Sequence, residues 1–249
     1  MSLLHAIAIF AAGIAAGTIN TVVGSGTLIT FPTLLAFGYA PVVANVSNTI
    51  GLVPGAVSGA VGYRRELAGQ RERALSLAAA AGAGAVVGAV ALLVLPSSAF
   101  KAIVPFFIAV ALILILAQKR LNKLIGDRRR GHGERIGPAT VVGTFCSGIY
   151  GGYFGAAQGI LMLSILGLTI DDELQRLNAV KVITTGVANL VAGVVFVIAA
   201  HVAWAPAGLI AAGSVLGGVL GSRYGRRLPP AALRGLIVVV GIVAIIRLV

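Results

Sequence analysis

The pattern of apolar and polar residues divides the chain into ten apolar segments. They span residues 3–23, 27–38, 41–63, 74–95, 98–118, 137–155, 157–168, 174–200, 203–222 and 230–248. Most are close to the ~20 residues that a membrane-spanning helix needs. Segments 27–38 and 157–168 are too short to cross comfortably, so each is predicted to be a short tilted helix or a re-entrant piece.

The segments fall into two halves of similar design. A polar stretch, QKRLNKLIGDRRRGHGER, separates five segments from five, which predicts an N-terminal repeat over 1–118, a basic cytoplasmic linker over 119–136 and a C-terminal repeat over 137–249. Gly17 and Gly148 are 131 residues apart. The same offset relates Gly24, Gly55 and Gly62 to Gly155, Gly186 and Gly193. Each half places its short segment second, after a glycine-containing break, and a polar patch at the start of its third segment.

Composition indicates a membrane protein. The 249 residues are 58% hydrophobic and 10% charged, with a mean hydropathy of +1.02. A soluble domain of this length could not keep so much apolar surface out of water, so an all-α polytopic membrane protein is predicted. The first segment is interpreted as a membrane helix, with a cleaved signal peptide as the alternative.

The placement of charge predicts the orientation. The net charge is +12, and the basic residues gather in loops after the third, fifth and ninth segments, whereas loops 39–40, 96–97 and 201–202 carry no Lys or Arg. The positive-inside rule places the basic loops in the cytoplasm and both ends of the chain outside, in a bacterial inner (plasma) membrane. The charge pattern inverts between the halves, as two inverted-topology repeats of about five segments each, with short or broken second helices, would produce.

The two glycine-containing breaks are candidate substrate-binding elements. The first contains Gly24, Ser25, Gly26 and Thr27, and the second contains Gly155 and Gln158. Two interpretations stay open: close helix packing through small residues, or a discontinuous helix whose freed N-terminus offers N–H donors to an anion. Because breaks stand at corresponding positions in both halves, the pattern favours the second interpretation, which is typical of transporters.

Polar residues at the starts of the third and eighth segments are further candidates. Ser47 and Asn48 lie in ANVSNT, and each is expected to cap a helix or to bind substrate. Asn178 lies deeper in the corresponding helix of the second half and is expected to supply a hydrogen bond to the substrate. Lys181 lies deeper, where a lysine costs a few kcal/mol unless it faces a cavity or a partner. It is predicted either to snorkel to the interface or to be the countercharge of an anionic substrate.

The acidic residues are predicted in loops or at helix ends. They are Glu66, Glu72, Asp127, Glu134, Asp171, Asp172 and Glu173, and the last three fit the first turn of a helix. Proton relay through a carboxylate in the core is therefore not expected, while passive flux, sodium held by carbonyls and a proton carried on the substrate stay open. No His/Asp/Ser constellation or metal-ligand spacing is present in the sequence, so neither an enzyme nor a cofactor is predicted.

The duplicated pattern resembles the sulfite exporter TauE/SafE family of membrane permeases over nearly the whole chain. The resemblance rests on GTINTVVGSGTLITFPTLLAFGYAP and ANVSNTIGLVPGAVSGAVGY in the first half, and on GIYGGYFGAAQGILMLSILGLTIDDELQRLNAVKVITTGVANLVAG in the second. It implies a duplicated integral membrane protein that moves sulfite, sulfonates or related small organic and sulfur anions.

The function expected from the sequence is a small-anion permease that works by alternating access, with the breaks and polar helix starts meeting near the midplane. The expected partners are a small anionic substrate and the lipid bilayer; nucleic acid is not expected, and a homo-oligomer stays open. Two rival functions stay open as well. One is a channel-like anion pathway through the same residues, and the other is a membrane assembly subunit without flux.

Overall fold

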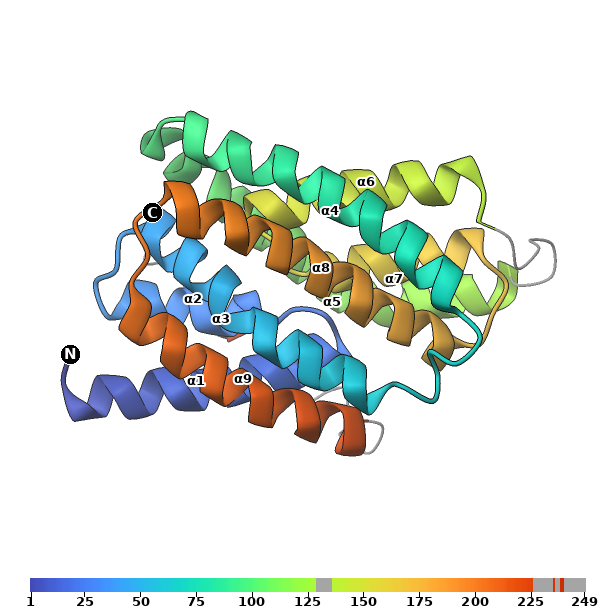
Figure 1. Ribbon diagram of the computed structural model, residues 1–249, viewed down its shortest axis with the longest axis horizontal. Helices are drawn as coiled ribbons and strands as arrows, with labels where there is room; N and C mark the ends of the chain where they lie inside the picture. Colours follow the sequence, from blue (N-terminus) through green and yellow to red (C-terminus); the bar gives the residue numbers. More distant parts are fainter. Residues whose placement is uncertain (129–135, 226–234, 236–237, 240–249) are drawn as a thin grey trace.

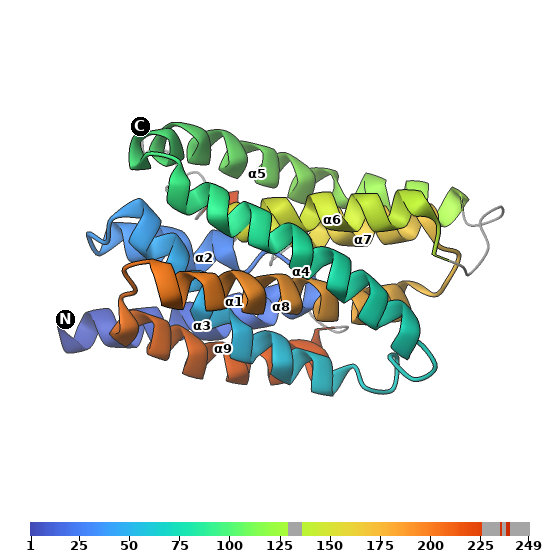
Figure 2. The same cartoon turned by 45° about the horizontal axis from the view of Figure 1, so that its top comes forward.

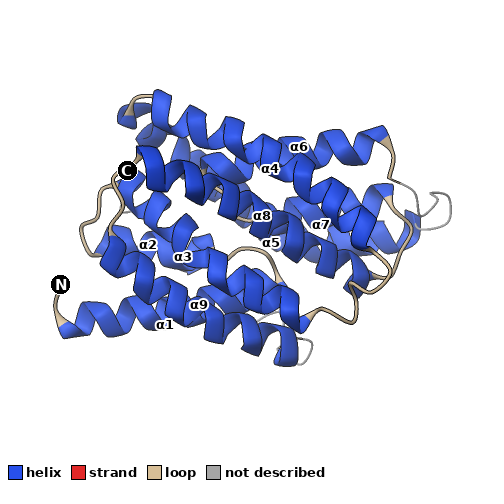
Figure 3. Cartoon of the chain, viewed as in Figure 1, coloured by secondary structure: helices blue, strands red, loops and turns tan. Residues whose placement is uncertain are grey.

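The computed structural model describes residues 1–128, 136–225, 235 and 238–239, and these residues form helices joined by short loops, without a strand (Figures 1 and 3). In chain order the helices are α1 (Leu3–Val22), α2 (Thr27–Ala36), α3 (Pro41–Gly62), α4 (Arg71–Val94), α5 (Ser97–Arg128), α6 (Pro138–Tyr153), α7 (Gln158–Thr169), α8 (Leu174–Ala199) and α9 (Trp204–Tyr224). The all-α prediction is confirmed for this part of the chain. The predicted segment 230–248 lies almost entirely outside the described residues, as do residues 129–135 of the predicted linker.

Length and hydropathy agree with a polytopic membrane protein. Five of the described helices are long and apolar enough to cross a membrane: α1, α4, α5 over Ser97–Ala117, α8 and α9. α2 and α7 are short apolar helices of 10 and 12 residues, which matches the two short predicted segments. Large apolar side chains such as Val94 and Ile198 are mostly exposed on the bundle surface, where a bilayer would cover them.

α5 extends further than the apolar pattern predicts. The hydropathy of the chain falls after residue 118, yet the helix continues to Arg128. Leucine, lysine and arginine are good helix formers, and the stretch after residue 118 contains no proline before α5 ends. The first part of the polar stretch is therefore helical.

The helices form two groups whose most extensive contact is between α3 and α8. α1, α3 and α9 pack together, α4, α6 and α8 pack together, and α3 against α8 joins the groups (Figures 1 and 2). The short helices lie inside this arrangement, α2 against α1 and α3, and α7 against α6 and α8. Small residues allow the close contacts: a Cβ on Gly17 would lie 2.4 Å from the Ser214 carbonyl oxygen, and a Cβ on Gly148 would lie 2.2 Å from that of Ala81.

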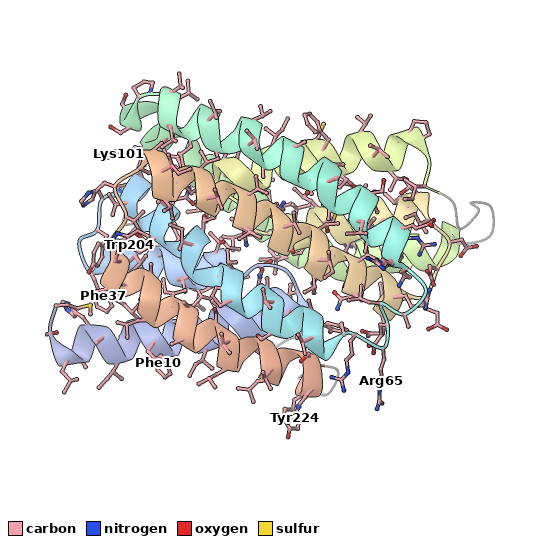
Figure 4. The ribbon with its side chains drawn as sticks, in the orientation of Figure 1. Phe10, Phe37, Arg65, Lys101, Trp204 and Tyr224 are labelled. Carbon is pink, nitrogen blue, oxygen red and sulfur yellow. The ribbon has the colours of Figure 1, made fainter. Side chains whose placement is uncertain are left out.

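The basic loops gather at one end of the bundle. Figure 4 shows Arg65 and Tyr224 at this end and Phe37, Lys101 and Trp204 at the opposite one. We call it the basic end and define it by Arg64, Arg65, Arg71, Arg73, Arg176 and Arg223. Arginines at one end of an apolar bundle are the distribution that the positive-inside rule associates with the cytoplasmic side.

Candidate functional site

The two breaks in the helices touch each other inside the bundle. The backbone N–H of Gly159 donates a hydrogen bond to the carbonyl oxygen of Gly24 at 3.0 Å. A Cβ on Gly24 would lie 2.3 Å from the Cα of Gly159, so side chains are excluded from the contact. Gly24 also has φ +84°, a left-handed conformation that glycine adopts at little cost. We call residues 23–26 and 154–159 together the junction.

Four helix ends meet at the junction. α1 ends at Val22 and α6 ends at Tyr153, while α2 begins at Thr27 and α7 begins at Gln158. The ends of α1 and α6 present carbonyl groups with partial negative charge, and the starts of α2 and α7 present N–H groups with partial positive charge. The starts of the two short helices therefore provide the kind of donors that bind anions.

Lys181 of α8 lies at the junction, and its side chain is fully buried, with 0% exposure. Its ammonium donates hydrogen bonds to the carbonyl oxygens of Thr21 at 3.1 Å and Asn20 at 3.4 Å. These carbonyls belong to the last turn of α1, where a cation is favourable. A Cβ on Gly159 would lie 3.0 Å from the Lys181 Cδ, so the stem of the lysine passes beside the start of α7. The snorkelling interpretation is therefore wrong.

No described carboxylate neutralises Lys181. Of the acidic residues that the structure describes, Glu66 and residues 171–173 lie in loops, Glu72 is in the first turn of α4, and Asp127 is in the last turn of α5. The hydrogen bonds that Lys181 makes within the described ranges go to neutral backbone carbonyls, which reduce the cost of its burial without cancelling its charge. The junction thus holds one buried cation and two helix N-termini.

Asn48 connects α3 to the start of α2. Its Nδ2 donates to the Thr27 hydroxyl oxygen at 3.2 Å, and its Oδ1 accepts a hydrogen bond from the Thr30 hydroxyl. The neighbouring Ser25 hydroxyl is buried and has no hydrogen-bond partner among the described residues. A buried hydroxyl without a partner is costly, which makes Ser25 available to a bound ligand.

Neutral groups hold the second break. The Asn45 Nδ2 donates to the Tyr153 carbonyl oxygen at the end of α6 at 3.0 Å, and the Gln158 Nε2 donates to the Ser147 carbonyl oxygen at 3.0 Å. The Tyr150 hydroxyl donates to the carbonyl oxygen of Ala156 within the break. The Asn45 amide and the Tyr150 hydroxyl therefore satisfy freed carbonyls here, and the Gln158 amide attaches the start of α7 to α6, all without a charge.

The structure brings most of the predicted site residues together. At or beside the junction lie Gly24, Ser25, Gly26, Thr27, Asn48, Gly155, Gln158 and Lys181. Ser47 is turned elsewhere, because its hydroxyl accepts a hydrogen bond from the Ala203 N–H at the start of α9. Asn178 precedes Lys181 by one turn of α8. Among the described residues its Oδ1 is buried without a partner, and none of them connects it to the breaks by a hydrogen bond.

Helix starts explain two corrections to the sequence-based expectations. α3 begins at Pro41, so Ser47 and Asn48 lie beyond its first turn and cannot cap it, although Ser47 does accept a hydrogen bond from the N–H of Ala203, the residue that precedes α9. α8 begins at Leu174, so Asp172 and its acidic neighbours precede the first turn instead of forming it. Asp172 joins the starts of two helices through ion pairs with Arg73 and with Arg176, the latter at 2.9 Å.

The environment of Asp172 keeps it ionised. Burial raises the pKa of its carboxyl group, but the hydrogen bonds from Arg73 and the Glu173 N–H, together with the charges of Arg176 and Arg73, outweigh burial. The net effect lowers the pKa of Asp172 below its ordinary value. This carboxylate lies at the basic end, so it stabilises the loops there and does not compensate Lys181.

Sequence reasoning missed three residues that lie at or beside the junction. Thr30 lies within an apolar run, and nothing in the sequence marks it as a site residue. Asn45 belongs to the polar patch ANVSNT, and Gly159 is the last glycine of the second break. The positions of Asn45 in the polar patch and of Gly159 in the second break could have indicated both as candidate site residues. Which of several neighbouring polar residues faces a break depends on where each helix begins.

Comparisons with known proteins agree with this architecture. The model of the family described as sulfite exporter TauE/SafE matches residues 9–248. A probable membrane transporter protein of a Sinorhizobium species is 31% identical over 96% of this chain and 90% of its own length. The probable membrane transporter protein YfcA of Escherichia coli is 25% identical over 94% of this chain and 86% of its own. A probable membrane transporter protein of Haemophilus influenzae is 26% identical over 86% of this chain and 83% of its own length. No solved structure matches the chain.

The family match covers nearly the whole chain, including both breaks and Lys181. The family is one of transporters, which confirms the prediction that the protein is not an enzyme. Broken helices that meet inside an apolar bundle, together with this match, identify an integral membrane transporter. The chain belongs to the sulfite exporter TauE/SafE family.

Proposed function

We propose that the protein is a secondary transporter that moves sulfite, sulfonate or related organosulfur anions across a bacterial inner membrane by alternating access. The observation that carries this proposal is the environment of Lys181, a fully buried ammonium without a carboxylate partner among the described residues. A buried charge is expensive unless a partner compensates it, and intramembrane cations commonly mark the path of an anion.

The donors of the junction suit an oxyanion. The start of α2 carries Ser25 and Thr27, and the start of α7 carries Gln158, all of them buried. Charge-assisted hydrogen bonds from an ammonium are stronger than those between neutral groups, so Lys181 would supply most of the affinity. In this role the Lys181 ammonium gives up its hydrogen bonds to the carbonyl oxygens of Thr21 and Asn20 and donates hydrogen bonds to oxygens of the substrate.

We also propose that the halves are inverted repeats. In Figure 1 α1, α3 and α9 run from left to right, while α6, α8 and α4 run from right to left. In this relation α1 corresponds to α6 and α4 corresponds to α9. The contact of α1 with α9 in one group then corresponds to the contact of α6 with α4 in the other. Gly17 packs on α9, and its counterpart Gly148 packs on α4. These relations support two repeats, 1–118 and 137–249. The fourth helix of the first repeat, α4, packs with α6 and α8 of the second, and the fourth helix of the second repeat, α9, packs with α1 and α3 of the first.

Inverted repeats support alternating access. When two halves of one fold have opposite orientations, exchanging their conformations moves the opening from one side of the membrane to the other. The junction is built from the broken helices of both halves, so a site there would stay between the two openings. The substrate would then bind where the halves meet.

The test is flux of labelled sulfite and of a short sulfonate in proteoliposomes, with the pH gradient present and absent. Wild type is compared with Lys181→Met and with a matched control, Lys101→Met, which removes an exposed lysine at the start of α5. The proposal predicts saturable flux with counterflow in wild type and in the control, and at least a tenfold loss in Lys181→Met.

Each alternative has its own result. Unsaturable flux without counterflow would favour a channel-like pathway. Absence of flux of both anions in folded wild-type protein would contradict the sulfur-anion assignment. Equal flux in the two lysine variants would remove Lys181 from the substrate site but keep the transporter.

A further inference from the structure

A second polar site lies at the basic end, away from the junction. A cavity of about 650 Å³ opens between the last turns of α3 and α9. Its walls include Arg64, Arg65, Arg223, Glu66 and the hydroxyl-bearing residues Ser58 and Ser222, and no residue of the junction lines it. The volume is in the range of small-molecule sites in proteins.

The cavity has an excess of positive charge. Three arginines line it against one glutamate, and none of these arginines forms an ion pair with a described residue. Ser58 and Ser222 donate their hydroxyl protons to the backbone carbonyl oxygens of Val215 and Val219 at 3.0 and 3.1 Å. Arg64 donates one hydrogen bond to the carbonyl oxygen of Val61 at 3.5 Å. The remaining guanidinium donors of the three arginines are available to a ligand, and the guanidinium fork matches the oxygens of a phosphate group.

The surface beside the cavity is apolar. Val57 and Val61 of α3 are 60% and 57% exposed, and Val219 and Leu220 of α9 are 37% and 43% exposed. Tyr224, which is 50% exposed, lies at the same end as Arg65 (Figure 4). Exposed aliphatic residues along α3 and α9, an aromatic residue near their ends and arginines beyond it follow the depth profile of a phospholipid, from acyl chain to headgroup.

We propose that this cavity binds the phosphate headgroup of an anionic phospholipid in the cytoplasmic leaflet, with its acyl chains along the exposed valines and leucine of α3 and α9. The combination of a phosphate-binding set of arginines with an adjoining apolar surface favours a lipid over a free anion, which would contact only the arginines. The inference does not depend on the transported substrate.

The test measures lipid binding to purified protein in detergent by native mass spectrometry and by thermal unfolding. The probes are phosphatidylglycerol, phosphatidylcholine and inorganic phosphate. The site variant is Arg65→Gln with Arg223→Gln, and its matched control is Arg71→Gln with Arg120→Gln, which removes two exposed arginines that do not line the cavity.

Wild type and the control are expected to bind phosphatidylglycerol and to gain thermal stability from it, with little response to phosphatidylcholine. The site variant should bind phosphatidylglycerol roughly tenfold or more weakly than the control, since each cationic residue near a lipid phosphate contributes about a factor of five. Equal binding by the two double variants would overturn the site. Equal stabilisation of wild type by inorganic phosphate would overturn the assignment to a lipid.

Discussion

The two breaks have the same backbone plan but different caps. Lys181 of α8, in the second half, caps the end of α1, and Asn45 of α3, in the first half, caps the end of α6. Each break is therefore completed by a side chain from the opposite half. The first break receives the amino group of a lysine, which can carry a positive charge, and the second receives a neutral amide.

If the two halves are repeats, as proposed above, this difference explains how one of the two breaks can acquire a charged site that the other lacks. Both caps satisfy carbonyl groups that a broken helix exposes, a requirement that the two breaks share. Only one cap needs a charge to attract an anion, and two ammonium groups close together in a buried site would disfavour each other's charged form. The comparison separates the groups that maintain the breaks from the group that we expect to select the substrate.

The largest effect is expected where the breaks touch. Gly24→Ala should prevent the junction from forming, because its Cβ would lie 2.3 Å from the Cα of Gly159 in addition to the strain at φ +84°. The matched control is Gly38→Ala, which has φ +85° but no atom within 4 Å of its added Cβ. The control should cost only about 1–2 kcal/mol, the penalty for a left-handed residue.

Thermal unfolding and size-exclusion chromatography of both glycine variants measure this difference. We expect Gly24→Ala to be poorly folded or inactive and Gly38→Ala to be close to wild type. Similar stability of the two variants would show that contact between the breaks is not required for folding.

The next largest effect concerns the charge. Lys181→Gln makes the first break resemble the second, because an amide can still donate to the α1 carbonyls. We expect the free energy of unfolding to change by no more than ~1–3 kcal/mol, the range for one buried hydrogen-bonding group, while sulfite flux falls at least tenfold. Flux and chemical unfolding in the same detergent and lipid are the measurements, and wild-type flux would contradict the assigned charge role.

The converse change tests the neutral cap. Asn45→Ala leaves the Tyr153 carbonyl without its side-chain donor, so we expect a loss of about 1–3 kcal/mol in the free energy of unfolding. The apparent KM for the anion, measured per folded protein, should stay near that of wild type. Thr49→Ala is the control, because the hydrogen bond of the Thr49 hydroxyl in the described part of the chain stays within its own helix and goes to the Asn45 carbonyl. An increase in KM as large as that of Lys181→Gln would place Asn45 in the substrate site.

The smallest effect is expected for charge at the protein surface. Asp172→Asn removes the ion pairs that join α4 and α8, with an expected cost of roughly 1 kcal/mol near neutral pH. The pKa of Asp172 is lowered in the folded state, so its contribution is fully present above the unfolded pKa of about 4. It is lost as the pH falls through the lowered folded value.

Melting curves of wild type and Asp172→Asn between neutral and strongly acidic pH check this sign. The difference in melting temperature should shrink below about pH 4, where the unfolded carboxyl group is already protonated. A difference that persists unchanged at low pH would show that the aspartate acts by packing and not by its charge.

Local patterns in the sequence predicted much of the candidate site. Gly24 and Gly155 stood out because glycines interrupt long apolar runs, and Lys181 stood out because charge is rare in such runs. Ser47 was indistinguishable from Asn48 by these criteria, since both lie in the same polar patch. The orientation of each depends on the helix start at Pro41 and on the neighbours that α3 meets.

The sequence by itself determined the membrane class, the positions of the helices in the described part of the chain and the presence of two breaks. These properties depend on hydropathy and on backbone chemistry, which act over neighbouring residues. Only the tertiary structure decided that the breaks touch, that Lys181 reaches α1 and that Asn45 reaches α6. Those contacts join residues more than a hundred positions apart, and they form only when close packing of small residues brings the two halves together.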